Sequence, residues 1–242
     1  MGKISKKVLS EIKKYSPNQL IIASELYRDR FSSDMSETAF AKLISRLCLS
    51  GKIERISKGI YCIPEDTSYG KILPSESEIV KLYTKNENGV VIGYEMYNYF
   101  GITTQIAKLF EVYSSSIDEK EKNIGNVKIK KYNLHYNQKT KSMIYILELL
   151  YNYKHIQDLN TNIFVKEIER LLNGYDEKVF EVVQKEIKYP KWVIAFLYEA
   201  LEYYHISNKL NRYLSSFSTY SIPKMRDLYE SARQEREVFN FN

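Results

Sequence analysis

Polar and basic side chains gather on one face of a helix predicted over residues 36–50. Ser36 can cap its first turn, Gly51 can end it, and an apolar stripe marks the face that should pack on a core. That stripe comprises Phe40, Leu43, Ile44 and Leu47. At about 100° per residue, the other side carries Thr38, Lys42, Ser45 and Arg46. This side suits the major groove of DNA, whose width of about 12 Å admits a helix, although any surface helix also has a solvated face.

A hairpin predicted directly after this helix carries two more cations. Residues 52–56 and 60–63 have the pattern of short strands, and Gly59 supplies the positive φ that the three-residue loop between them needs. Arg55 and Lys58 therefore lie on the hairpin. Positive charge there can contact phosphates or the minor groove of DNA.

Two helices and a short strand are predicted before these elements. Residues 3–15 have apolar side chains at helical spacing, and Pro17 ends that helix. A β-favouring run follows at residues 20–22, and a second helix covers residues 25–31. The order of three helices and a two-stranded hairpin is that of a winged helix-turn-helix. It predicts a sequence-specific DNA-binding domain over residues 1–66.

The excess positive charge of the chain lies in this first segment. Residues 1–64 contain 12 Lys and Arg against 6 Asp and Glu, a net charge of +6, and this equals the net charge of all 242 residues. Such asymmetry is typical of a module that neutralises phosphates. A solubilising basic terminus is the alternative, and the order of the elements favours the DNA-binding interpretation.

Two segments resemble a known family. Gly-Lys-Ile-Glu-Arg-Ile-Ser-Lys-Gly-Ile-Tyr at residues 51–61 is similar to the hairpin of AbiEi-type antitoxins, and residues 89–105 are similar to the strand, short helix and turn that follow it there. The resemblance covers roughly residues 20–110. It implies an antitoxin and autoregulating transcriptional repressor of a bacterial type IV toxin–antitoxin system. The implied partners are the double-stranded operator DNA of its own operon and a nucleotidyltransferase-like toxin.

The rest of the chain predicts an α+β protein with a helical end. Residues 67–73 have linker composition, and strands alternate with helices in a small mixed α/β domain over residues 67–135. A charged run at residues 118–123 is expected as an exposed turn. Residues 136–242 form the helical part, rich in tyrosine, which serves either core packing or a partner surface.

Signals for catalysis are missing from the sequence. It has no P-loop, no Gly-x-Ser-x-Gly, no His-Glu-x-x-His and no dinucleotide-binding fingerprint. Cys48 and Cys62 lack zinc-ligand spacing, so neither a metal nor a cofactor is expected. We therefore predict a cytoplasmic, non-enzymatic protein without a membrane partner. The alternatives are an enzyme that acts on nucleic acid or nucleotides through the middle domain, and a transcription regulator without a toxin partner.

Overall fold

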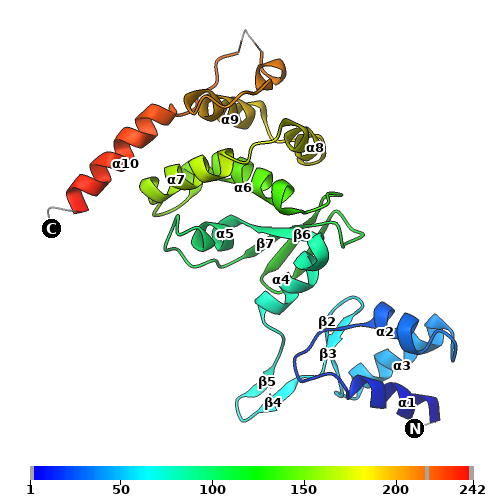
Figure 1. Cartoon of the computed structure of the whole chain (residues 1–242). Helices are drawn as coiled ribbons and strands as arrows, with labels where there is room; N and C mark the ends of the chain where they lie inside the picture. Colours follow the sequence, from blue (N-terminus) through cyan, green and yellow to red (C-terminus); the bar gives the residue numbers. More distant parts are fainter. Residues whose placement is uncertain (1–2, 216–217, 240–242) are drawn as a thin grey trace. The chain divides into compact units, whose positions relative to one another are not determined.

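The computed structural model describes residues 3–215 and 218–239 and has a mixed α+β fold with a helical C-terminal region (Figure 1). It divides into two compact units, Met1–Lys81 and Leu82–Asn242. From the sequence we expected three domains, over residues 1–66, 67–135 and 136–242. The difference arises because the second and third segments share a core, as described below.

Three helices build most of the first unit. They are α1 (Lys3–Ile12), α2 (Ala23–Arg30) and α3 (Glu37–Leu49). Their apolar faces meet in one core, in which the rings of Phe31 and Phe40 stack with centroids 5.5 Å apart. The same core takes in Ile53, which follows α3 and has no exposed surface. Burial of each large apolar side chain stabilises the folded state by about 1.5–3 kcal/mol. The same burial determines which face of α3 is turned toward the core.

A three-stranded antiparallel sheet completes the packing of the first unit. Its strands, in the order β1-β3-β2, are β1 (Ile21–Ile22), β3 (Ile60–Cys62) and β2 (Glu54–Ser57). Ser57 pairs with Ile60, so the hairpin loop has two residues, Lys58 and Gly59, rather than the three that we expected. Gly59 has φ +78°, a conformation that costs glycine little and other residues more.

The segment expected as a linker over residues 67–73 is instead part of a second hairpin. Its strands are β4 (Glu65–Thr67) and β5 (Gly70–Ile72). The hydroxyl of Thr67 donates to the carbonyl of Gly70 at 2.7 Å and accepts from the backbone N–H of Tyr69, which ties the turn together. Helix α4 (Glu76–Thr84) follows.

The second unit contains a mixed four-stranded sheet. Its strands, in the order β6-β7-β9-β8, are β6 (Gly89–Ile92), β7 (Phe110–Ser114), β9 (Val127–Lys131) and β8 (Glu121–Ile124). Strands β7 and β9 are parallel, and the other pairs are antiparallel. The exposed turn expected over residues 118–123 is therefore wrong in its second half. Charged residues occur there in a strand because β8 is an edge strand with one side open to solvent.

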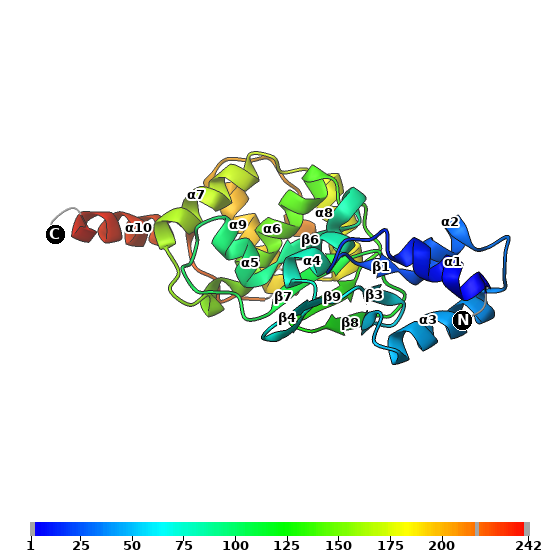
Figure 2. The same ribbon diagram turned by 90° about the horizontal axis from the view of Figure 1, so that it is seen from below.

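Helices cover this sheet and extend beyond it. Short helix α5 (Gly93–Tyr99) follows β6, and the longer helices are α6 (Gln138–Asn152), α7 (Thr161–Leu172), α8 (Glu177–Ile187), α9 (Lys191–Tyr203) and α10 (Met225–Phe239). The 3-10 turns are η1 (Lys85–Glu87), η2 (Tyr153–His155) and η3 (Leu210–Tyr213). Figure 2 shows α6 with α7, α8 and α9 grouped around it.

Sheet and helices of the second unit share one hydrophobic core. Val90 and Tyr113 of the sheet belong to the same buried cluster as Leu147 of α6 and Phe196 of α9. Residues 135 and 136 therefore do not separate two compact units. Among residues 3–215 and 218–239, no helix combines the length and apolar character needed to cross a bilayer.

Candidate nucleic-acid interface

Helix α3 is positioned by its cap and its apolar stripe. The hydroxyl of Ser36 accepts from the backbone N–H of Ala39 at 3.3 Å, which satisfies one donor of the first turn. Phe40, Ile44 and Leu47 are buried in the core of the first unit. The opposite side of α3 is open to solvent, and the exposed residues on it include Thr38, Lys42, Ser45 and Arg46. The structure thus brings these four predicted residues together on one helix.

The hairpin presents the other two predicted residues. Arg55 lies on β2 opposite Tyr61, and Lys58 is the first residue of the two-residue loop. Both side chains are exposed. All six candidate residues are therefore accessible to a partner, and contact with DNA stays a prediction for each of them.

Ion pairing divides the cations of the first unit into two sets. Several pair with carboxylates of the same unit, in the pairs Lys7–Asp34, Lys14–Glu11, Arg28–Asp29, Arg30–Glu11 and Lys71–Glu54. In the part of the chain that the structure describes, no ion pair or side-chain hydrogen bond involves Lys42, Arg46, Arg55 or Lys58. The positive charge on α3 and on the hairpin is thus left uncompensated by the protein.

An exposed leucine on α3 was missed by the sequence analysis. Leu49 is 89% exposed, and it follows Ser45 by four residues on the side that carries Lys42. The signal was available, because residues 38, 42, 45 and 49 repeat at helical spacing and Leu49 lies off the core stripe. A large apolar side chain among polar ones can contact the methyl group of thymine.

A shallow groove beside α3 supports a competing interpretation of the same cations. Ile4 of α1 and Leu43 of α3 contribute to its apolar lining, and Lys42 and Arg46 border it. Its volume is about 480 Å³, and Ile4 is half exposed. Lys42 and Arg46 could therefore border a contact with another protein, which an experiment has to separate from DNA contact.

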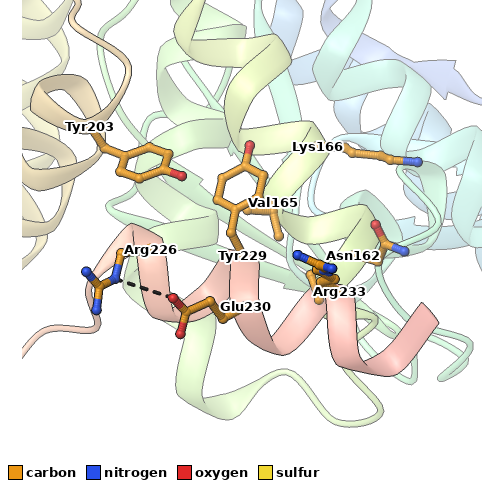
Figure 3. A pocket seen from close by; sticks show the side chains of 9 residues that line it. Asn162, Val165, Lys166, Tyr203, Arg226, Tyr229, Glu230 and Arg233 are labelled. Atoms are coloured by element: carbon orange, nitrogen blue, oxygen red, sulfur yellow. Dashed lines mark ion pairs between the residues drawn. The ribbon is translucent and has the colours of Figure 1, made fainter. Parts of the chain in front are cut away.

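The second unit has a groove between α7 and α10 (Figure 3). Tyr203 and Tyr229 form part of its wall, with their rings stacked at 5.5 Å between centroids. Arg226 pairs with Glu230 at its edge, with 3.4 Å between Nε and Oε1, and Lys166 also lines it. The groove measures about 360 Å³ and combines aromatic surface with charges, a mixture common at protein interfaces.

Burial suppresses the reactivity of Cys62. Cys62 is fully buried in β3, and burial raises the pKa of its thiol to about 11, so the thiolate is scarce at neutral pH. Cys48 is half buried in α3, and neither cysteine is in a disulfide. Within the described residues, His, Cys, Asp and Glu side chains form no group of three that could hold a metal ion.

Comparison with known proteins adds no assignment. No protein-family model matches the chain, and no curated protein matches it. The resemblance to AbiEi-type antitoxins therefore stays a prediction that rests on residues 51–61 and 89–105. The first of these segments contains the β2–β3 hairpin, and the second contains β6, α5 and the turn after them.

Proposed function

We propose that the first unit is a winged helix-turn-helix module that binds double-stranded DNA, with α3 in the major groove and the β2–β3 hairpin on the backbone. The observation that carries this proposal is the set of exposed, unpaired cations on these two elements. Cations without internal partners remain available for phosphates, and phosphate neutralisation supplies most of the affinity of non-specific DNA binding.

Sequence discrimination is assigned to α3. The hydroxyls of Thr38 and Ser45 can bond base edges, and the guanidinium of Arg46 can bond guanine in bidentate fashion. Leu49 adds apolar surface for thymine methyl groups. The rigid attachment of α3 to the core holds these groups in one arrangement, which is what discrimination between base pairs requires.

A mobility-shift assay with the DNA upstream of the protein's own gene tests the proposal. We expect the double variant Lys42→Ala with Arg46→Ala to bind this DNA more weakly, since each base-edge contact is typically worth about 1–3 kcal/mol. The matched control is Lys14→Ala with Arg28→Ala, which removes the same charge from residues already paired with carboxylates. Equal affinities of the two double variants would refute the role of α3.

The groove beside α3 gives this assay a second readout. If Lys42 and Arg46 serve a protein contact, the double variant changes self-association in sedimentation measurements while its intrinsic affinity for a half-site DNA stays that of wild type. That result would assign Lys42 and Arg46 to a protein interface and not to the DNA interface.

A second candidate function concerns the second unit. The resemblance implies that it neutralises a nucleotidyltransferase-like toxin, and the tyrosine-lined groove between α7 and α10 is the observation that favours a protein-binding role (Figure 3). A fragment of residues 70–242 keeps α4 whole and leaves out the hairpin and α3. We expect it to lose DNA binding and to rescue cells that express the toxin. A folded fragment that does not rescue would favour a transcription regulator without a toxin.

A further inference from the structure

A small polar cavity lies in the second unit between the sheet and α6. Its lining includes four groups that can carry charge, namely Glu111, Lys130, Glu148 and His155, together with tyrosine rings. The volume is about 170 Å³, well below the roughly 300–1,000 Å³ of pockets that hold drug-sized ligands. The buried side chains of Tyr97 and Tyr113 lie on the inner side, and the exposed Tyr151 and His155 lie at the rim.

A buried carboxylate anchors the inner end of this cavity. Glu148 of α6 is only 3% exposed. Its Oε1 accepts from the hydroxyls of Tyr113 at 2.8 Å and Tyr189 at 2.6 Å, and its Oε2 accepts from Nδ2 of Asn152 at 3.1 Å. Burial raises the pKa of Glu148, while the bonds from the two tyrosines oppose that rise. Oε2 accepts this one hydrogen bond from Asn152 and can accept another from a ligand.

Two further charged groups face the cavity without a partner of their own. Glu111 on β7 and Lys130 on β9 are half buried, and neither makes a hydrogen bond or ion pair with any residue in the described ranges. An unpaired charge that is half buried loses part of its hydration, which a ligand of opposite charge can replace. Opposite charges left open toward one small cavity point to a ligand that supplies both partners.

The backbone runs close to one of these groups. Gly93 has φ +68°, and a Cβ there would lie 2.6 Å from Oε2 of Glu111. The positive φ favours glycine at this position. The turn between β6 and α5 therefore passes beside the carboxylate of Glu111.

The register of the sheet sets the spacing of the two charges. Glu111 and Tyr113 are two residues apart on β7 and share a face, and Tyr113 is paired with Lys130 on the parallel strand β9. Glu111 is paired with Lys128, so Lys130 lies two residues further along β9 and on the same face of the sheet as Glu111. A short molecule can reach both side chains from one place.

We propose that this cavity binds a small zwitterion of the size of an α-amino acid. Its ammonium group lies at the carboxylate of Glu111, with Oε2 of Glu148 as a further hydrogen-bond acceptor, against the tyrosine rings, and its carboxylate lies at the ammonium of Lys130. A simple amine is disfavoured by the positive charge of Lys130, and a simple acid by the negative charge of Glu111. Aromatic rings around an ammonium group add cation–π attraction. The proposal is independent of DNA binding by the first unit.

Calorimetric titration of the full-length protein with each of the twenty standard amino acids tests this site. We expect at least one small amino acid to bind and to raise the melting temperature, as any ligand of the folded state does. The analogues that lack one charge should bind at least about tenfold more weakly; for alanine these are ethylamine and propionate. Absence of binding by every amino acid at millimolar concentration, or equal binding of ethylamine and alanine, would overturn the proposal.

Substitutions in the cavity lining test where the amino acid binds. Glu111→Gln and Lys130→Met should each weaken it about 10- to 100-fold, because each removes one charge-assisted interaction. The controls Glu95→Gln and Lys108→Met change exposed residues outside the cavity lining and should bind as wild type does. Unchanged binding in both cavity variants would place the ligand elsewhere and refute the site. If a variant fails to fold, the comparison of alanine with ethylamine and propionate on the wild-type protein still tests the proposal.

Discussion

The salt dependence of DNA binding measures how many cations contact phosphate, and Lys58 is the residue on which to test it. Lys58 lies in the tight loop of the β2–β3 hairpin, is exposed, and has no ion-pair partner among the described residues. Replacing it with alanine removes one charge without removing buried surface. The fold should therefore stay intact, and the loss should appear in the electrostatic part of binding.

The expected slope of log K against log salt concentration follows from the number of cations that contact phosphate. If Lys42, Arg46, Arg55 and Lys58 each neutralise one phosphate, the slope of log K against log salt is about −3.6, at roughly −0.9 per contact. Affinity then falls roughly 150-fold between about 50 and 200 mM salt. With Lys58→Ala the slope becomes about −2.7, and the same change of salt lowers affinity only roughly 40-fold.

Fluorescence anisotropy of labelled DNA at four or more salt concentrations gives this slope. The matched control is Lys14→Ala, which removes the same charge from the same unit at a residue whose Nζ lies 2.5 Å from Oε1 of Glu11. We expect the control to keep the wild-type slope. Equal slopes for wild type and Lys58→Ala would mean that the hairpin does not reach the DNA. Equal reductions in both variants would mean that net charge matters and the position of the charge does not.

Three further predictions follow from single residues. Leu49→Ser should leave the unfolding free energy within about 0.5 kcal/mol, since Leu49 is 89% exposed. It should weaken binding to thymine-containing sites more than to random DNA in competition assays. Ser36→Ala removes the cap of α3 and should cost about 1 kcal/mol in urea unfolding, against no change for the exposed control Ser33→Ala. The raised pKa of Glu148 means that the folded chain holds a proton that the unfolded chain releases near its ordinary value of 4.5. The contribution of Glu148 to stability should therefore fall as pH rises above that value, and Glu148→Gln should gain stability relative to wild type toward neutral pH by at most about 1.4 kcal/mol per pH unit. Parallel pH profiles of the two proteins would contradict this reasoning.

Local signals made α3 predictable from the sequence. Ser36 is the N-cap, Gly51 has φ +69° just beyond the helix, and the apolar stripe between them is buried. Each of these features acts over a few residues, so the helix ends and the exposed side could be derived without tertiary information. The same holds for the β2–β3 hairpin, whose loop length was in error by one residue because Ser57 stays paired.

Features that depend on distant residues were not predictable. Strands β4 and β8 consist largely of polar and charged residues, and they form because partner strands supply hydrogen bonds. The polar cavity was also missed, although one signal was present. Glu148 is a lone charge in the apolar run of α6, and such a residue must find donors when the helix is buried. Its donors Tyr113 and Tyr189 are 35 and 41 residues away in sequence.

The shared core of the second unit has a consequence for how the protein unfolds. Sheet residues such as Val90 and Tyr113 have the side chains of α6 and α9 as their apolar surroundings. Neither the sheet nor these helices can unfold without exposing apolar side chains of the other. Both should therefore unfold in one cooperative transition. The first unit has a separate core and can melt at its own temperature. A protease acting near the first transition should therefore cleave within residues 1–81 and leave the sheet and its helices as one resistant fragment.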